Sequence, residues 1–253
     1  MKIQVVIPCH LDSVRLRNKV LIDIYGLPMV EHVRRRVLLA KAVDKVYIAT
    51  GDKEIKEVIE DFGGDVIYTR HKHENGTSRV AEAISEIEST HVLLVQGDEP
   101  LIIPEYIDIF IEEMHKSKNH LMWNGISKID DKKLLDDISV VKCIKNKNDE
   151  IISCFRKSPI SNFDSSTLNV IYKIQGLIAY EKQFLYNMIN KENTLYSKSE
   201  SIEQMKAIEI GSVIKSILLP RSFPSVNTKN ELNKVLNILK EDFTQIKIHN
   251  KIK

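Results

Sequence analysis

The sequence lacks any apolar run long enough to cross a membrane, since a spanning helix needs about 20 predominantly apolar residues. Cysteine is scarce, and Cys9, Cys143 and Cys154 are too few and too widely spaced for a disulfide framework or a zinc site. The charge is nearly balanced, with 37 basic and 35 acidic residues. This balance gives no reason to expect a nucleic acid or a membrane as partner. We therefore expect a protein of the reducing cytoplasm.

Several well-known catalytic motifs are also absent. The sequence contains no G-x-x-x-x-G-K-[ST] phosphate loop and no G-x-G-x-x-G dinucleotide fingerprint. It contains no H-E-x-x-H zinc motif and no G-x-S-x-G nucleophile turn. P-loop, NAD-binding, zinc-protease and acyl-transfer enzymes are therefore poor models for this chain. A phosphate site, if there is one, has to be built from other residues.

One apolar run ends in an acidic turn. Val92–Val95 are apolar without alternation, which predicts a strand buried on both faces. Gly97 permits a tight turn at the end of this strand, and Pro100 stiffens the exit. Asp98 therefore lies at the carboxyl edge of a sheet, where open α/β sheets bind ligands. Its carboxylate suits Mg²⁺ bound together with substrate phosphates, although it could instead cap the turn or the helix that begins near Pro104.

Strands and helices are expected to alternate in the first half of the chain. We expect strands at 3–7, 46–49, 66–68 and 92–95, with helices from Pro28 to 38, at 53–62 and at 77–87. This alternation predicts a doubly wound parallel sheet. Beyond residue 117, strand-like runs follow one another at 121–127, 139–144 and 150–154, which indicates an antiparallel insert. The remaining expected elements are strands at 171–180 and 213–219, helices at 181–189, 201–210 and 229–241, and a fraying tail from Lys247.

The polar loop after the first strand is a candidate phosphate site. It carries Ser13, Arg15 and Lys19 directly after a buried strand. Backbone N–H groups and cations in such a loop can surround phosphates, and they can neutralise charge as pyrophosphate leaves. The alternative is that these are ordinary solvated charges, as basic residues usually are.

Two helix starts have both a structural and a functional interpretation. Asn75-Gly76-Thr77 precedes a helical stretch, where Gly76 lets a ligand approach the backbone and Thr77 can cap the helix. A helix N-terminus also favours an anion or a polar base edge. Ser201 and Gln204 have capping-box spacing, and this structural role competes with substrate binding.

Together, these segments resemble the 3-deoxy-manno-octulosonate (KDO) cytidylyltransferases, which make CMP-KDO. The matching segments are Ile7-Pro8-x-x-x-x-Ser13-x-Arg15-Leu16-x-x-Lys19, Gly26-Leu27-Pro28-Met29-Val30-x-His32-Val33, Thr69-Arg70 followed by Asn75-Gly76-Thr77-x-Arg79, and Val95-Gln96-Gly97-Asp98-Glu99-Pro100. Weaker matches are Ser158-Pro159-Ile160, Lys173-x-x-Gly176-x-x-Ala179-Tyr180, Glu203-Gln204 and Val226-Asn227-Thr228. The likeness spans nearly the whole chain and is dense before residue 105.

The resemblance implies both a fold and a reaction. The implied fold is α/β, a Rossmann-like nucleotide-diphospho-sugar transferase fold with a mostly parallel central sheet and an antiparallel insert. We expect one domain over residues 1–253, with the insert at about 118–180 serving dimerisation. The implied reaction is Mg²⁺-dependent and couples CTP to a 2-keto-3-deoxy acid sugar, giving a CMP-sugar and pyrophosphate. The expected setting is lipopolysaccharide biosynthesis in the cytoplasm, by a homodimer.

The resemblance also implies roles for individual residues. Arg15, Lys19 and Asp98 would be catalytic, and Asp98 and Asn227 would bind Mg²⁺. Residues implied to bind the nucleotide are Pro8, His10, Ser13, Arg15, Lys19, Thr69, Asn75, Gly76, Thr77, Arg79 and Gln96. Residues implied to bind the sugar are Lys173, Gln175, Glu203 and Gln204.

The sequence departs from the family at several of its motif positions. His10 stands where the family has Arg, Gly51 where it has Asp, Ile174 where it has a sugar-binding His, and Asn227 where it has a second metal-binding Asp. The amide oxygen of Asn227 can still ligate Mg²⁺ but brings no negative charge. Since the nucleotide half is better kept than the sugar half, we expect CTP-dependent transfer to an acceptor other than KDO. The candidate acceptors are another ulosonic acid and a small phosphonate or phosphate. Two further alternatives are an enzyme that uses another nucleotide and a non-catalytic relative that binds nucleotide.

Overall fold

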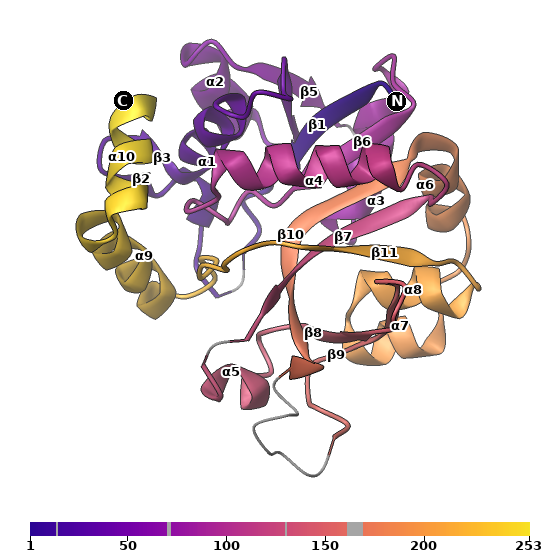
Figure 1. The fold of residues 1–253 in the computed structure, drawn as a ribbon. Helices are drawn as coiled ribbons and strands as arrows, with labels where there is room; N and C mark the ends of the chain where they lie inside the picture. The colour runs from indigo at the N-terminus through magenta and orange to yellow at the C-terminus, as the bar shows by residue number, and fades with distance from the viewer. Residues whose placement is uncertain (14, 70–71, 130, 161–168) are drawn as a thin grey trace. The chain divides into compact units, whose positions relative to one another are not determined.

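The computed structural model describes residues 1–13, 15–69, 72–129, 131–160 and 169–253. The chain divides into two compact units, Met1–Ile111 with Phe223–Lys253, and Glu112–Ser222 (Figure 1). The strands are β1 Ile3–Pro8, β2 Asp23–Ile24, β3 Leu27–Pro28, β4 Val46–Thr50, β5 Asp65–Tyr68, β6 His91–Val95, β7 Met122–Lys128, β8 Lys142–Lys145, β9 Ile151–Phe155, β10 Tyr172–Glu181 and β11 Ile214–Leu218. The helices are α1 Met29–Leu38, α2 Lys53–Asp61, α3 Gly76–Ser85, α4 Pro104–Lys116, α5 Lys133–Asp136, α6 Lys182–Ile189, α7 Leu195–Glu200, α8 Glu203–Glu209, α9 Lys229–Glu241 and α10 Phe243–Ile252, with a short 3₁₀ helix, η1, at Lys19–Leu21.

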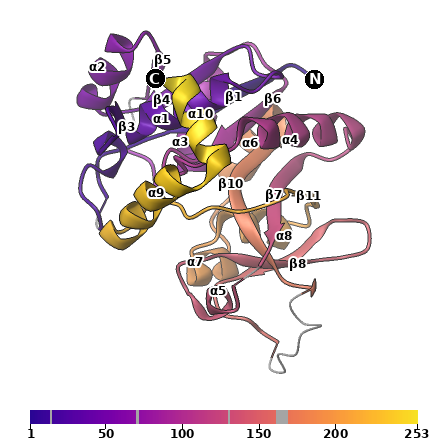
Figure 2. The same ribbon diagram turned by 60° about the vertical axis from the view of Figure 1, so that its left-hand side comes forward.

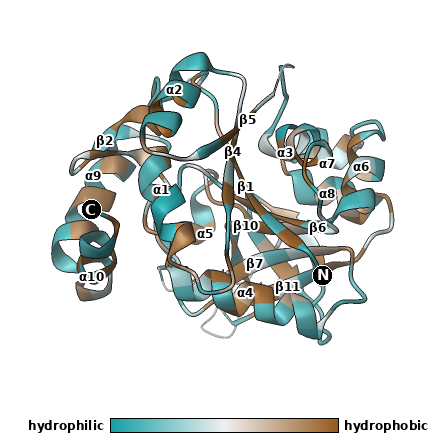
Figure 3. Cartoon of the chain, turned by 90° about the horizontal axis from the view of Figure 1, so that it is seen from above, coloured by the Kyte–Doolittle hydropathy of each residue, from teal (hydrophilic) through white to brown (hydrophobic). Residues whose placement is uncertain are grey.

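The first unit contains a sheet of four parallel strands in the order β6-β1-β4-β5. Val6 and Ile7 of β1 and residues 92–95 of β6 have no exposed surface, as their unbroken apolar runs predict. Figure 3 shows hydrophobic residues on β1 and β4, with hydrophilic residues on the neighbouring helix α2. The predicted parallel sheet is therefore confirmed, and β1 and β6 are adjacent within it.

The second unit contains the antiparallel strands. β10 pairs antiparallel with β7 and with β8, and β8 pairs antiparallel with β9. β11 adds to β7 in parallel. The predicted antiparallel part is confirmed, while the boundaries of the insert and the single-domain organisation remain predictions. No helix in the described ranges is long and apolar enough to cross a membrane.

Two predicted helix caps are wrong. Asn75, and not Thr77, caps α3, because its side-chain oxygen accepts the N–H of Ser78 at 2.9 Å. Ser201 does not begin a helix; it ends α7 in a left-handed conformation with φ 53°. A capping box does occur at the start of α9, where the side chains of Thr228 and Glu231 bond reciprocally to the backbone.

The expected fraying of the tail from Lys247 is also wrong. Residues 243–252 form α10, which is capped by Asp242, whose side chain accepts the N–H of Gln245. Ile248 and Ile252 are buried one turn apart, so the lysines of this segment occupy the exposed face of an amphipathic helix. Arg35 of α1 donates a hydrogen bond to the carbonyl of Ile252 at 2.6 Å. Figure 2 shows α10 lying beside α1.

The stability of the protein is expected to fall as the pH drops below about 6.5. Burial, and then the charges of Arg36 and His249, lower the pKa of His32 from 6.5 to about 3. Between these values the unfolded chain binds a proton that the folded protein excludes. The free energy of unfolding should therefore decrease by up to about 1.4 kcal/mol per pH unit from this group. Urea unfolding at pH 7, 6 and 5 measures this slope.

Two variants separate His32 from other groups. His32→Gln should show a shallower pH dependence than the wild type between pH 7 and 5. His115→Gln removes an exposed histidine and should keep the full slope. An identical slope in all three proteins would show that His32 does not carry the effect.

Candidate nucleotide site

A pocket of about 290 Å³ lies at the carboxyl ends of β1 and β6 in the first unit. Because these strands are parallel neighbours, their ends meet at the same edge of the sheet. The lining residues come from the segment after β1, the turn after β6 and the start of α3. They are Pro8, Cys9, His10, Asp12, Lys19, Val20, Lys72, His73, Glu74, Asn75, Gly76, Arg79, Gln96, Gly97 and Asp98. Eight predicted site residues are thus brought together in one pocket.

Lys19 is the centre of a polar cluster at this pocket. Its Nζ donates to Oδ2 of Asp98 at 2.6 Å and to Oδ1 of Asn227 at 2.9 Å. Arg15 also donates to Oδ1 of Asn227, at 3.3 Å. The backbone N–H of Val226 donates to the carbonyl of Asp98 at 2.8 Å, which joins the segment before α9 to the turn after β6. Asp98 thus contacts Lys19, one of the two predicted cations, whereas Arg15 contacts Asn227 and is not among the lining residues. The roles of these residues remain predictions.

The oxygen atoms of this cluster fit Mg²⁺. Asp98 offers a carboxylate and Asn227 an amide oxygen, and both already contact the ammonium group of Lys19. Hard oxygen donors of this kind are the ligands that Mg²⁺ takes in proteins. No group of three or more His, Cys, Asp or Glu in the described parts of the chain could hold a metal alone. Substrate oxygens would therefore have to complete the coordination, as Mg²⁺ bound to a triphosphate allows.

Two glycines let the pocket walls come close to β1. A Cβ atom on Gly97 would lie 2.7 Å from Sγ of Cys9, and one on Gly76 would lie 3.1 Å from Cγ of Pro8. Larger residues would push the turn after β6 or the start of α3 outward. Both glycines therefore allow the start of α3 and the turn after β6 to pack closely against Pro8 and Cys9.

The electrostatics of the pocket suit an anion. Arg79 is buried and donates to Oγ1 of Thr69 at 2.6 Å. Gly51 lies beside it, because a Cβ there would be 3.3 Å from the Arg79 guanidinium. Desolvation, followed by the positive charges of Arg79 and Lys19, lowers the pKa of His10. Burial, followed by the charge of Asp98, raises the pKa of the Cys9 thiol, so this cysteine is neutral and is no candidate nucleophile.

Other predicted residues lie away from the lining. The N–H of Ser13 bonds to the carbonyl of Leu11 in the loop after β1, and Thr77 is buried in α3. Arg70 of the Thr69-Arg70 motif lies outside the described residues.

The residues predicted to bind the sugar all lie in the second unit. Gln204 donates to Oδ1 of Asn124 at 2.8 Å, and Gln175 donates to Oγ of Ser127 at 2.9 Å. Both glutamines are buried, while Lys173 and Glu203 are half-buried. The structure thus gives Gln175 and Gln204 protein partners, and the sugar-binding roles of the four residues remain predictions.

Several lining residues were not predicted from the sequence. These are Cys9, Asp12, Val20, Gly97 and the segment 72–74. Cys9 and Gly97 lie inside or beside recognised motifs, so the predicted residues next to them could have indicated that they line the pocket. His73 bonds to Glu82 at 2.8 Å, a pairing that no motif indicates.

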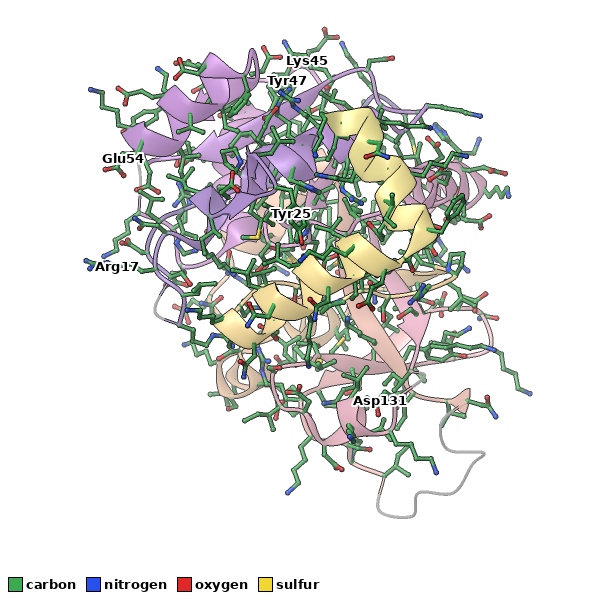
Figure 4. All side chains as sticks on the ribbon, turned by 90° about the vertical axis from the view of Figure 1, so that its left-hand side faces the viewer. Arg17, Tyr25, Lys45, Tyr47, Glu54 and Asp131 are labelled. Carbon is green, nitrogen blue, oxygen red and sulfur yellow. The ribbon has the colours of Figure 1, made fainter. Side chains whose placement is uncertain are left out.

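Arg15 and Arg17 form a matched pair for a test of the loop. Arg15 contacts Asn227, whereas Arg17 is exposed and extends away from the ribbon in Figure 4. The family resemblance assigns Arg15 to the triphosphate of CTP, so Arg15→Gln is expected to raise the KM for CTP about tenfold, since a hydrogen bond to a charged group contributes roughly 1.5–3 kcal/mol. Arg17→Gln should leave the KM within twofold of the wild type. Equal effects of the two substitutions on steady-state kinetics would contradict this assignment.

Comparison with known proteins identifies the family of the chain. A family model described as cytidylyltransferase matches residues 4–217. The chain is 35% identical to a 3-deoxy-manno-octulosonate cytidylyltransferase of Geotalea daltonii, covering 95% of this chain and 99% of the relative. It is 32% identical to an 8-amino-3,8-dideoxy-manno-octulosonate cytidylyltransferase of Shewanella amazonensis, covering 96% of this chain and 100% of the relative.

A solved structure gives the same result for the fold. A CMP:2-keto-3-deoxy-manno-octonic acid synthetase complexed with CTP matches with a TM-score of 0.89 and 29% identity, covering 96% of this chain and 100% of that one. The fold is therefore the nucleotidyltransferase fold that the motifs imply. The chain belongs to the cytidylyltransferase family and is an enzyme of its 3-deoxy-manno-octulosonate cytidylyltransferase type.

Proposed function

We propose that this protein catalyses the Mg²⁺-dependent transfer of CMP from CTP to a 2-keto-3-deoxy acid sugar, with release of pyrophosphate. The observation that carries the proposal is the cluster in which Lys19 contacts both Asp98 and Asn227 beside the pocket. Cations and metal-binding oxygens lie next to each other there, which is the arrangement that a triphosphate with its metal ion requires. One solved structure that matches this chain is a complex with CTP, which supports CTP as the nucleotide.

The residues of the chain would act mainly by placement and charge. Lys19 and Arg15 would bind oxygens of the triphosphate, and Lys19 would stabilise the charge that develops as pyrophosphate leaves. Gln96 and the Asn75–Thr77 turn would contact the cytidine. Asp98 and Asn227 would hold Mg²⁺, which neutralises phosphate charge when bound. The anomeric hydroxyl of the acceptor would attack the α-phosphorus, so no covalent bond to the protein is needed.

The acceptor is proposed from the relatives and from the second unit. Relatives are named for 3-deoxy-manno-octulosonate and for its 8-amino-3,8-dideoxy form, so the family accepts more than one ulosonic acid. In this chain Ile174 occupies the position of the family's sugar-binding His, which removes a polar contact. We therefore favour a modified ulosonic acid over KDO itself; a small phosphonate is the second candidate.

A pyrophosphate-release assay tests the proposal. CTP is supplied with and without Mg²⁺, together with KDO, 8-amino-3,8-dideoxy-manno-octulosonate, other ulosonic acids or a small phosphonate. Turnover that needs Mg²⁺ and one of the ulosonic acids is expected. Robust turnover on KDO alone would contradict the acceptor preference, and no turnover with any acceptor would contradict the reaction.

Asn227→Asp should lower the Mg²⁺ concentration needed for half-maximal activity. The substitution adds a carboxylate where the cluster has a neutral amide oxygen, and carboxylates bind Mg²⁺ more strongly. We expect a decrease of about tenfold, corresponding to about 1.4 kcal/mol. A Mg²⁺ titration of the initial rate measures it. An unchanged or higher midpoint would show that residue 227 does not approach the metal.

We also propose that the protein is a cytoplasmic homodimer in lipopolysaccharide biosynthesis. β9 pairs with β8 only among the strands of the described ranges, and its Ile152 is 52% exposed. Exposed apolar residues on an edge strand favour coverage by another chain. Light scattering coupled to size-exclusion chromatography should give twice the chain mass of 29.1 kDa.

A further inference from the structure

Helix α10 is tied to the turn that follows Asp98. The buried side chain of Gln245 donates from Nε2 to the carbonyl of Leu101 at 2.9 Å and accepts at Oε1 from Nη1 of Arg36 at 2.6 Å. The same Nη1 of Arg36 donates to the carbonyl of Ile102 at 3.2 Å. One glutamine from α10 and one arginine from α1 therefore hold two consecutive carbonyl groups.

Two histidines extend this network. Nε of Arg36 donates to Nδ1 of His32 at 3.1 Å, so His32 must carry its proton on Nε2. That nitrogen lies 3.1 Å from Nδ1 of His249 on α10, and the two rings are stacked with centroids 5.2 Å apart. Burial is the largest cause that lowers the pKa of both histidines. The network thus contains neutral histidines and one charged group, Arg36.

Burial of the Arg36 charge in this network lowers the stability of the fold. Arg36 is completely buried, has no carboxylate among its hydrogen-bond partners, and leaves Nη2 without a partner in the described chain. Burying an unpaired charge costs free energy, and an apolar residue would pack without that cost. Stability therefore does not explain why Arg36 is buried here. Its role is explained by the backbone that Arg36 and Gln245 bind, at Leu101 and Ile102.

The backbone at Leu101 and Ile102 belongs to the connection between β6 and α4 that contains Asp98. The N–H of Ile102 bonds to the carbonyl of Glu99, and the carbonyl of Asp98 accepts from Val226. We propose that Gln245 and Arg36 are positioning residues that fix the turn after β6, so that the carboxylate of Asp98 meets Lys19 and the bound triphosphate correctly. This inference rests on the proposed function, because the role of Asp98 in the reaction is part of that proposal.

A matched set of variants tests the inference. Gln245→Leu removes both hydrogen bonds of the side chain. Gln245→Glu is nearly isosteric, keeps an acceptor for Arg36 and loses the donor to Leu101. Ile248→Ala is the control, since it weakens the packing of α10 through a buried residue that has no side-chain hydrogen bond to the turn.

Two readouts are used for each variant. Hydrogen exchange of the amides in 97–102 should become about tenfold faster in both Gln245 variants, and should stay near the wild-type rate in Ile248→Ala. The kcat for pyrophosphate release should fall about tenfold in the Gln245 variants, because small displacements of a catalytic group are costly. Their KM for CTP should stay within twofold. Ile248→Ala should lower Tm without either change.

The results separate the possible failures. If the Gln245 variants and Ile248→Ala change exchange and kcat equally for an equal loss of Tm, α10 is only a packing element and the inference is overturned. If Gln245→Leu does not fold, Gln245→Glu gives the same comparison. If the wild type shows no turnover, the proposed function fails, while the exchange measurement still decides whether Gln245 holds the turn.

Discussion

Replacing Asp98 with asparagine is expected to lower the rate of CTP-dependent pyrophosphate release by about a thousandfold, which equals the upper value for the loss of one preorganised oxyanion-hole donor. Asp98 supplies the only carboxylate that contacts Lys19 in the described residues. An asparagine retains the shape and one oxygen but removes the negative charge that Mg²⁺ prefers. The rate should recover in part at high Mg²⁺ if the lost interaction is with the metal, as we propose. Initial rates over a Mg²⁺ series measure both effects.

The control for this variant removes a carboxylate elsewhere in the same unit. Glu54 of α2 is exposed and lies at the edge of the molecule in Figure 4, so Glu54→Gln should retain wild-type activity. Glu54→Gln should have a Tm close to that of the wild type. Asp98→Asn should remain folded, because asparagine keeps an oxygen that can accept from Lys19. An Asp98→Asn enzyme with more than a tenth of wild-type activity at low Mg²⁺ would contradict a metal-binding role.

Replacing Lys19 with methionine is expected to lower kcat/KM for CTP by about a hundredfold or more. The ammonium group contacts Oδ2 of Asp98 and Oδ1 of Asn227. When CTP binds, we expect it to contact the triphosphate. Methionine keeps nearly the length of the lysine side chain but cannot neutralise the charge of the triphosphate. Unlike Asp98→Asn, this variant should not be rescued by Mg²⁺, because the oxygens of Asp98 and Asn227 that we propose to bind the metal remain.

Lys41→Met provides the comparison for the lost lysine. Lys41 is exposed, so its loss changes the net charge without touching the pocket. Its kcat/KM should stay within twofold of the wild type. Restoration of Lys19→Met activity by high Mg²⁺ would show that the lysine acts on the metal site and not on the nucleotide.

The core of the site was predictable because it depends on regular structure. The apolar run before Asp98 required a buried strand, and a parallel sheet places the end of that strand at the same edge as the end of the first strand. The family resemblance assigned Lys19 and Asp98 to one site, and the structure shows that β1 and β6 are neighbours and that the two side chains are in contact. The family resemblance placed Asn227 at the metal position, since no local pattern joins residues so far apart in the chain, and the structure shows its contact with Lys19.

The parts that were missed depend on single side chains from distant segments. Lysines concealed the amphipathic pattern of α10, whose buried residues include Ile248 and Ile252. The capping-box spacing at Ser201 is shared with the real box at Thr228, and spacing alone does not tell which one starts a helix. The bonds of Gln245 to Leu101 and Arg36 have no sequence signature, because each joins different secondary-structure elements.

A crystal structure of the protein with CTP and Mg²⁺ tests the central claim most directly. The account predicts a metal ion about 2.1 Å from a carboxylate oxygen of Asp98 and from triphosphate oxygens, with Lys19 and Arg15 on the phosphates. Nucleotide bound away from this pocket, or a metal that Asp98 does not ligate while its carboxylate stays on Lys19, would contradict it.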